Sequence, residues 1–233
     1  MRNRPVPHIA DAQKDYVRSL VIYEDAYLLA FDKPAGLAVQ TRGNRGTSLD
    51  HLLWTFARSN GKRPQLVHRI DAGTSGLIIA AKTKPATAAL SAEFAERRVR
   101  KRYLALVGGE LPLSDRGVCE IPLLKSDRIV VPGRLEDGAD AAKTSWTVLA
   151  RAGINGLIEA RPETGRMHQI RAHLAALGCP ILGDRIYGAR EPAAERLMLH
   201  AAGLEITLPD KKKLALEAPV SDDFELKKQA LGC

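Results

Sequence analysis

Cysteine is scarce in this chain, with 3 residues among 233. Cys119, Cys179 and Cys233 lie far apart, and no two of them form a Cys-x-x-Cys pair. Disulfide frameworks need an even, closely spaced set of cysteines, and zinc knuckles need paired ones. The sequence therefore excludes both kinds of site and predicts a protein of the reducing cytoplasm.

Long apolar runs are absent as well. The opening stretch MRNRPVPHIADAQKD lacks the apolar core of a signal peptide. No segment approaches the roughly 20 apolar residues that a membrane-spanning helix needs. We therefore expect a soluble protein that makes no membrane contact.

Motifs of several common enzyme classes are missing too. The chain has no G-x-x-x-x-G-K-[ST] loop, and Ser75 does not sit in a G-x-S-x-G elbow. His168 and His173 are five positions apart and diverge around a helix, whereas metal-binding HExxH motifs place their histidines four apart. P-loop hydrolysis, serine acyl transfer and a paired-histidine metal site therefore lack support, and we expect no metal.

Positive charge is in excess, with 35 lysines and arginines against 27 acids, a formal charge of +8 and a pI near 9.5. This excess favours a polyanionic partner. The acids are numerous enough for an ordinary mixed surface, so charge alone does not decide the matter.

Short strand-like segments dominate the chain and favour hairpins in a largely antiparallel sheet. Two strands are predicted around a turn at Glu24 and Asp25, one at 77–82, and two more in RLMLHAAGLEITLP. Further strands are expected in RVRKRYLALVGG, GVCEIPLL, AAKTSWTVLA and INGLIEARP.

Helices are predicted where apolar residues recur at helical spacing. The first covers 49–56 and is capped by Ser48, and the second covers 85–98 with a proline in its first turn. A third begins near Met167 and ends at Gly178, and a short one lies in SDDFELKKQALG. Residues 1–20 are predicted to form a tail or arm on the surface.

The turn in LVHRIDAGTSGLIIAAKT crowds His68, Arg69 and Asp71 directly ahead of an apolar run. Asp71 and Thr74 could simply satisfy the backbone groups of the turn. Alternatively, Asp71 is a catalytic carboxylate on a loop that a rigid strand presents.

A second polar cluster lies in ETGRMHQIRAH, which contains Arg166 and Arg171. Arg171 follows Ile170 of the apolar stripe and borders the buried face, where an arginine needs a carboxylate partner. Otherwise it is a surface cation whose stem covers apolar side chains.

The third cluster is a run of cations that leads into Tyr103. Such a run is usually a solvated face, and a strand tyrosine usually packs. An aromatic ring among cations is also what a stacked nucleobase and its phosphates require. The cations are Arg97, Arg98, Arg100, Lys101 and Arg102.

Taken together and in order, these motifs resemble those of the RluA-type RNA pseudouridine synthases. The resemblance rests on KPAGL at 33–37, HRIDAGTSGL at 68–77, KRYLALV at 101–107 and GRMHQIRAHLAALGCPILGDRIYG at 165–188. It covers roughly 21–219. Ile70 and Met167 depart from the usual residues of the family, and neither replaces a reacting group.

The resemblance implies a mixed α+β fold with a mainly antiparallel, bent central sheet, flanked by helices, and a central RNA-binding cleft. It implies a catalytic domain at 21–220, followed by a short C-terminal helix or tail at 221–233. The expected activity is isomerisation of a specific uridine to pseudouridine in structured RNA, a stem-loop of rRNA or tRNA. No cofactor is expected, and the protein is expected to be a monomer.

The resemblance also assigns roles to residues. Asp71 is implied as the catalytic carboxylate, acting on the ribose either by attack on carbon or by removal of a proton. A nearby cation favours the ionised carboxylate, and this role falls to Arg171. Tyr103 is implied to stack on the flipped base and Arg69 to enter the vacated space. The remaining RNA-binding candidates are Arg97, Arg98, Arg100, Lys101, Arg102 and Arg166.

Two other functions compete with this one. A non-catalytic RNA-binding or chaperone protein would use the same basic surface, but it has no reason to combine Asp71, Tyr103 and Arg171. A nucleoside glycosidase often uses paired carboxylates, and the HRIDAGTSG turn offers one.

Overall fold

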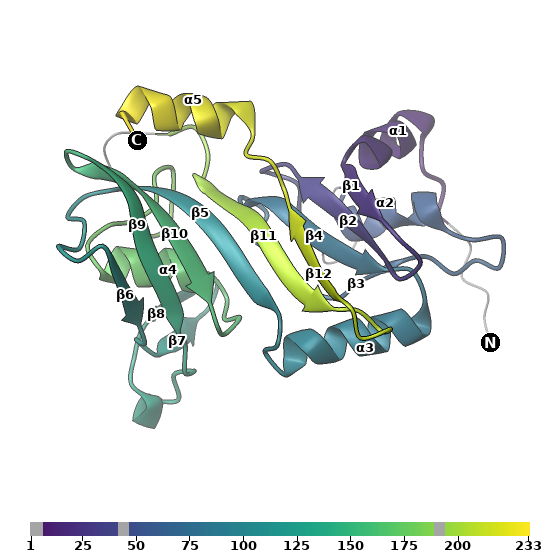
Figure 1. Cartoon of the computed structure of the whole chain (residues 1–233), viewed down its shortest axis with the longest axis horizontal. Coiled ribbons are helices and arrows are strands. Elements are labelled where there is room, and N and C mark those ends of the chain that lie inside the picture. Colours follow the sequence, from purple (N-terminus) through teal and green to yellow (C-terminus); the bar gives the residue numbers. More distant parts are fainter. Residues whose placement is uncertain (1–6, 42–46, 189–193) are drawn as a thin grey trace. The chain divides into compact units, whose positions relative to one another are not determined.

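The computed structural model describes residues 7–41, 47–188 and 194–233 (Figure 1). The chain divides into two compact units. Unit 1 comprises residues 1–99 and 205–218, and unit 2 comprises residues 100–204 and 219–233. Within the described ranges, no helix is long and apolar enough to cross a membrane.

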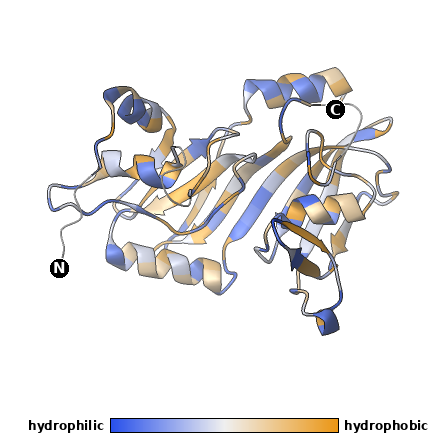
Figure 2. Ribbon diagram, turned by 180° about the vertical axis from the view of Figure 1, so that it is seen from behind, coloured by the Kyte–Doolittle hydropathy of each residue, from blue (hydrophilic) through white to orange (hydrophobic). Residues whose placement is uncertain are grey.

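Unit 1 is built on an antiparallel sheet in which β1 (Val21–Glu24), β2 (Leu28–Lys33) and β4 (Ser75–Ala81) are successive neighbours. The two-residue strand β3 (Gln65–Leu66) also pairs with β4. All residues of β4 are buried, as a continuous apolar run predicts. These strands are mostly orange in Figure 2, which marks hydrophobic residues.

Helical segments accompany this sheet. Helix α2 (Leu49–Leu52) continues as the 3₁₀ turn η1 (Leu53–Phe56), and α3 (Lys84–Ala95) lies against β4. Ser48 caps α2 as predicted, because its hydroxyl accepts the N–H of His51 at 3.3 Å. The predicted helix at 85–98 ends earlier than expected, and Arg97 has a φ of 58°, which an α-helix cannot continue.

The N-terminal segment differs from the surface arm expected over residues 1–20. Residues 11–19 form helix α1 (Asp11–Ser19), and Val17 on this helix is fully buried. Ile9, just before the helix, is 4% exposed. Two apolar side chains in a polar stretch are thus enough to anchor it to unit 1.

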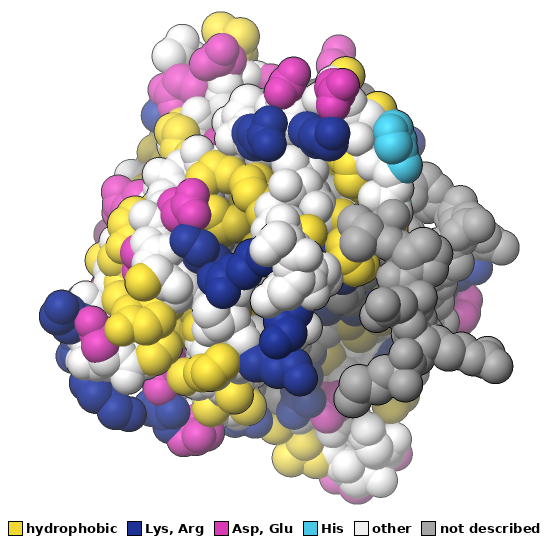
Figure 3. Space-filling model, turned by 90° about the vertical axis from the view of Figure 1, so that its right-hand side faces the viewer, with side chains coloured by type: hydrophobic (Ala, Val, Ile, Leu, Met, Phe, Trp, Pro, Cys, Tyr) yellow, Lys and Arg dark blue, Asp and Glu magenta, His cyan; other side chains and the backbone are white. Residues whose placement is uncertain are grey.

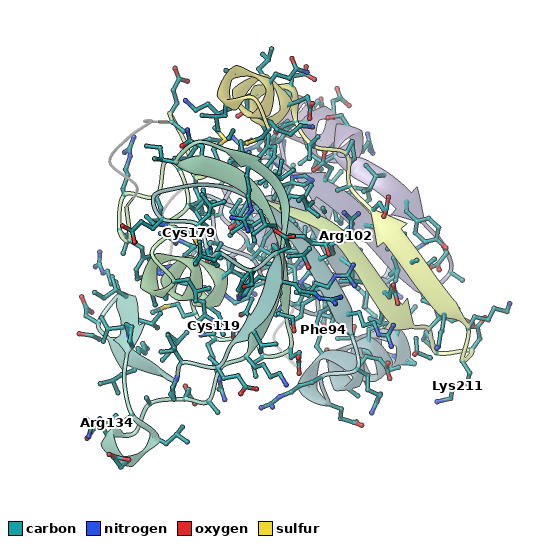
Figure 4. The ribbon with its side chains drawn as sticks, turned by 60° about the vertical axis from the view of Figure 1, so that its left-hand side comes forward. Phe94, Arg102, Cys119, Arg134, Cys179 and Lys211 are labelled. Carbon is teal, nitrogen blue, oxygen red and sulfur yellow. The ribbon has the colours of Figure 1, made fainter. Side chains whose placement is uncertain are left out.

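Unit 2 contains an antiparallel sheet in which β5 (Arg100–Gly108), β10 (Asn155–Pro162), β9 (Thr144–Ala152) and β6 (Arg116–Cys119) are successive neighbours. A separate hairpin joins β7 (Leu123–Ser126) and β8 (Ile129–Pro132). Leu106, Ile158 and Leu174 lie at the centre of the hydrophobic core. Cys119 and Cys179, labelled in Figure 4, belong to the same core.

One strand prediction was wrong. The segment RLMLHAAGLEITLP was expected to form two strands, and it forms the single strand β11 (Leu199–Thr207). Its neighbour β12 (Lys213–Glu217) follows after a turn at Lys211. Ala201 and Ala202, in the middle of this segment, are buried. Small residues here permit close packing of an uninterrupted strand.

Among its described residues, unit 2 contains two α-helices. Helix α4 (Gln169–Ala176) begins two residues after the predicted Met167, and α5 (Asp222–Leu231) is the predicted C-terminal helix. Gly178 ends the region of α4 as predicted, with a φ of 85° that favours glycine. The predicted α+β class, with mainly antiparallel sheet flanked by helices, is confirmed. The bend of the sheet and the central cleft stay predictions.

A buried polar network fixes α4 to β9. The ring of His173 is fully buried, with Nε2 3.0 Å from the carbonyl of Ile121 and Nδ1 2.9 Å from the hydroxyl of Thr144. A carbonyl only accepts, so Nε2 carries the hydrogen and Nδ1 accepts from Thr144. Gln169 donates to the same hydroxyl at 2.9 Å. Burial lowers the pKa of His173 below its usual value.

Stability should therefore fall in mild acid. The unfolded chain takes up a proton near the ordinary histidine pKa of about 6.5, whereas folded His173 resists protonation. The contribution of neutral His173 to the free energy of unfolding is complete above about pH 6.5 and is lost as the pH falls below that value. We expect the free energy of unfolding in urea to drop more steeply between pH 7.5 and 5.5 in the native protein than in His173→Gln. The difference is up to about 1.4 kcal/mol per pH unit. Equal pH slopes in the two proteins would contradict this assignment.

Candidate active site

Asp71 lies in the turn between β3 and β4 of unit 1. The turn is closed by the N–H of Thr74, which donates to the carbonyl of Asp71 at 3.1 Å. Thr74 and Ser75 are buried, whereas Asp71 is half-buried. A rigid strand thus presents a partly exposed carboxylate, which is the arrangement predicted for a catalytic group on a loop.

Lys33 ties this turn to a second loop. Its side chain is fully buried, and Nζ donates to the carbonyls of Pro34 at 2.8 Å, Leu37 at 2.9 Å and Ala72 at 3.1 Å. An ammonium group has three hydrogens to donate, and this arrangement provides three acceptors. The residue next to Asp71 is therefore held by a buried cation.

Gly36 adds a further bond between the two loops. Its N–H donates to the carbonyl of Ala72 at 2.8 Å, and its φ of 89° favours glycine. The sequence reasoning missed Lys33 and Gly36 as parts of the site. Their signal was the KPAGL motif, which had been quoted for the resemblance without a role for its residues.

His68 has a structural role in the same turn. Its Nε2 accepts the N–H of Ile79 at 3.0 Å, and its ring stacks on Phe94 with centroids 4.5 Å apart. Phe94 belongs to α3 and is labelled in Figure 4. The histidine therefore fastens the turn to β4 and to α3. Of the other two crowded side chains, Arg69 is exposed and Asp71 is half-buried.

Arg171 of unit 2 has the carboxylate partner that its position at the buried face predicted. Its Nε and Nη2 donate to the two carboxylate oxygens of Asp184, both at 2.7 Å. The side chains are 9% and 0% exposed, respectively. Burial raises the pKa of Asp184, but the bonds from Arg171 and from two backbone N–H groups outweigh it and hold the pKa below its ordinary value.

Tyr187 covers the face of the same guanidinium. The centre of the Arg171 guanidinium lies 5.2 Å from the centroid of the tyrosine ring. The hydroxyl of Tyr187 accepts the N–H of Val130 at 2.9 Å and lies 3.1 Å from Nδ1 of His168. Arg171 is thus fixed at one edge and one face. The sequence reasoning missed Asp184 and Tyr187, although both lie in the quoted GDRIYG string.

Tyr103 lies on β5, half-buried at the margin of the unit 2 core. Lys101 is two positions away and therefore on the same face of the strand, and its Nζ donates to the carbonyl of Thr164 at 3.0 Å. Nη1 of Arg102 lies 4.0 Å from Oε2 of Glu159. Tyr103 thus packs against the unit 2 core on a strand whose first residues are cations.

The other predicted RNA-binding cations differ in how far they are engaged. Arg98 bonds to Glu93 at 2.6 and 2.8 Å and also pairs with Glu96. Arg166 pairs with Asp140 at 3.1 Å. Arg97 and Arg100 are exposed. Their contacts with RNA stay predictions, and Arg98 would have to leave two carboxylates to make one.

The predicted catalytic residues are distributed over both units. Asp71 belongs to unit 1, and Tyr103 and Arg171 belong to unit 2. Within unit 2, Arg171 is brought together with Asp184 and Tyr187. The pairing of Arg171 with Asp71 stays a prediction.

Comparison with known proteins matches the sequence of this chain to one family. The family described as RNA pseudouridylate synthase matches residues 27–176. An uncharacterized RNA pseudouridine synthase of Zymomonas mobilis is 37% identical over 208 residues, which cover 88% of this chain and 94% of that protein. The ribosomal large subunit pseudouridine synthase C of Vibrio vulnificus is 36% identical, over 92% of this chain and 70% of its own length.

Solved structures agree with these relatives. Human RNA Pseudouridylate Synthase Domain Containing 4 superposes with a TM-score of 0.79 at 25% identity, over 95% of this chain and 97% of that one. The matched family segment includes both the Asp71 turn and the helix that carries Arg171. The chain therefore belongs to the RNA pseudouridylate synthase family, among its RluA-type members, and is an isomerase of uridine in RNA.

Proposed function

We propose that Asp71 performs the isomerisation on a uridine flipped out of a structured RNA. The observation that carries the proposal is the immobilised turn in unit 1. Lys33 and Gly36 hold Ala72 from one loop, and His68 holds the preceding residues to β4. A half-buried carboxylate fixed in this way is positioned for reaction without further ordering of the chain.

The reaction conserves all atoms and electrons. The bond between N1 of uracil and C1′ of the ribose breaks, the uracil turns while bound, and a bond from C5 to C1′ forms as C5 loses a proton and N1 gains one. Asp71 acts either by attack on the ribose carbon or by removal of a ribose proton, and both routes need its ionised form. The reaction consumes no cosubstrate.

Arg171 is proposed to be the cationic partner of Asp71 in the reaction. Asp184 engages Nε and Nη2 of its guanidinium. A guanidinium locked by a buried carboxylate and an aromatic face cannot swing away during the reaction. Asp184 and Tyr187 are then positioning residues that act through Arg171.

Base flipping is proposed to involve two further residues. A uridine inside a helix is out of reach, so it must leave the stack before its ribose can react. Tyr103, half-buried on β5, supplies a ring for stacking on uracil. Arg69, exposed beside Asp71, supplies a side chain to occupy the vacated space.

Ribosomal RNA is the substrate that the relatives favour. Several are named ribosomal large subunit pseudouridine synthase C or D, so we propose a uridine of large-subunit rRNA, with tRNA as the alternative. We further propose that the protein acts as a monomer in the cytoplasm. Pseudouridine mapping of total RNA from cells with and without the gene tests the substrate, since a single site should lose its modification.

Exchange of the reacting carboxylate should separate catalysis from binding. Asp71→Asn keeps the shape of the side chain and removes its charge, so we expect no detectable pseudouridine and an RNA affinity close to that of the native protein. The measurement is product formation on the mapped RNA, with binding in parallel. Turnover by the purified variant would refute the role of Asp71. If the chain only binds RNA, neither the native protein nor Asp71→Asn will form pseudouridine. If it is a glycosidase, the native protein will release free uracil.

Strain in the loop that supports Asp71 should lower the rate with little effect on binding. Gly36→Ala places a side chain at a φ of 89° where the new Cβ meets nothing within 4 Å, so strain is the main effect. It should cost about 1–2 kcal/mol in stability. A small displacement of Asp71 should lower kcat up to about 100-fold.

Gly138→Ala is the matched control. Its φ is 82°, its Cβ also meets nothing within 4 Å, and it lies in unit 2 after the 3₁₀ turn η2 (Leu135–Asp137). We expect the same loss of stability and an unchanged kcat. If both variants lower kcat equally, the effect comes from general destabilisation, and the positioning role of Gly36 is wrong.

A further inference from the structure

Unit 1 contains a basic cavity of about 450 Å³. It lies beyond the end of β4 that is opposite the Asp71 turn, because Lys82 and Thr83 directly follow β4 and contribute to its wall. Among the residues that the structure describes, its lining includes no carboxylate. The lining residues used below are Trp54, Arg58, Lys62, Arg63, Lys82 and Lys84.

Two of the five cations are neutralised within the unit. Arg63 makes a two-bond pair with Asp50 at 3.1 and 2.9 Å, and Lys82 pairs with Glu24 at 2.6 Å. Over the described parts of the chain, Arg58, Lys62 and Lys84 have no ion pair, and all three are exposed. The cavity therefore carries an excess of about three positive charges at its rim.

An aromatic wall accompanies these cations. The guanidinium of Arg63 lies over the ring of Trp54 at 5.3 Å. Arg63 is held by Asp50 and by the carbonyl of Pro64 at 3.1 Å, so it cannot easily leave the ring. Tryptophan and guanidinium planes are surfaces on which nucleobases stack. The wall is thus suited to an unpaired nucleotide.

The start of helix α3 adds to the positive potential. Thr83 caps the helix by accepting the N–H of Ala86 at 3.2 Å, and the first turn opens on the cavity through Lys84, Pro85 and Thr87. The N-terminal end of a helix carries a partial positive charge that favours anions. The helix end adds to the positive potential of the cations, and its contribution is smaller than that of the cations. Figure 3, a view of the right-hand side of Figure 1, shows lysine and arginine side chains interspersed with acidic and hydrophobic ones.

We propose that this cavity is a second RNA contact site, which binds the phosphodiester backbone of the substrate and lets a base stack at Trp54. The proposal rests on the proposed function. Strand β4 has 7 residues at about 3.3 Å each, so the cavity is roughly 20 Å from Asp71. That is several nucleotides along a strand, and the site contributes affinity and register while Asp71 supplies the chemistry.

An RNA chain suits the cavity better than a small anion. A site for one phosphate converges buried donors on a single point, whereas these three cations are long, exposed side chains on separate segments. A cavity of about 450 Å³ is also far larger than one phosphate. Successive phosphates of one RNA strand can contact cations on separate segments, and together they can occupy a cavity of this size.

Removal of the three unpaired cations should weaken RNA binding. In the triple variant Arg58→Gln, Lys62→Gln, Lys84→Gln, we expect the affinity to fall about 10- to 100-fold at 0.1 M salt. The slope of log K against log salt should flatten by about two units. The KM should rise far more than kcat falls, because the site is remote from Asp71.

The charge-matched control is Lys211→Gln, Lys212→Gln, Lys213→Gln at the turn between β11 and β12, where Lys211 is labelled in Figure 4. It removes the same charge from unit 1 away from the cavity lining. Its affinity and salt slope should stay close to native. If the two triple variants lose affinity equally, total charge is responsible and the site is refuted.

Fluorescence gives a readout local to the cavity. The chain has 2 tryptophans, and Trp146 is 6% exposed in the core of unit 2. We expect the mapped RNA hairpin to change the fluorescence of the native protein and of Asp71→Asn, but not that of Trp54→Phe. A change with inorganic phosphate alone and none with the hairpin would overturn the proposal.

The two proposals can fail separately. If the RNA binds through the cavity but the native protein forms no pseudouridine, the proposed function fails and the site stands. If pseudouridine forms normally and the cavity triple variant binds as tightly as the native protein, the site fails and the function stands.

Discussion

Burial of the Lys33 ammonium group is the constraint on which the arrangement of the active-site turn depends. An unpaired buried charge costs many kcal/mol, so the fold holds Lys33 only where its hydrogens have acceptors. The carbonyls of Pro34, Leu37 and Ala72 provide them, and they come from two loops far apart in the sequence. The hydrogen bonds of this one ammonium group thus fix both loops, and Asp71 lies next to Ala72, one of the bonded residues.

Unit 2 meets a similar requirement with a buried ion pair. Arg171 and Asp184 are each nearly or fully buried, and their two bonds of 2.7 Å compensate the loss of water. Backbone N–H groups of Ile186 and Tyr187 complete the acceptor demands of the carboxylate. In each unit, therefore, one predicted catalytic side chain, Asp71 or Arg171, adjoins or belongs to a buried charged group whose hydrogen bonds restrict its movement.

The cations of this protein divide by what they contact, which their number alone does not reveal. Lys33 and Arg171 are buried and hold structure, and Arg98 and Arg63 are engaged by carboxylates. Arg58, Lys62 and Lys84 are exposed around a cavity whose described lining residues include no acid. A net charge of +8 indicates a polyanionic partner, and the distribution of paired and unpaired cations indicates where contact is to be sought.

The sequence by itself determined the features that depend on neighbouring residues. Alternating and apolar runs predicted most strands, Ser48 and Gly178 marked helix ends, and the ordered motifs identified the family, because periodicity and turn chemistry are local properties. Only the tertiary structure decided which partners meet. In the folded chain, Arg171 donates to the carboxylate of Asp184, His68 accepts the N–H of Ile79, and Lys33 donates to the carbonyl of Ala72. It also kept HAAGL in one strand and buried Val17 in a polar stretch. These outcomes depend on how segments distant in the chain return to one another, and the free energy of burying a charge or an apolar side chain is settled only there.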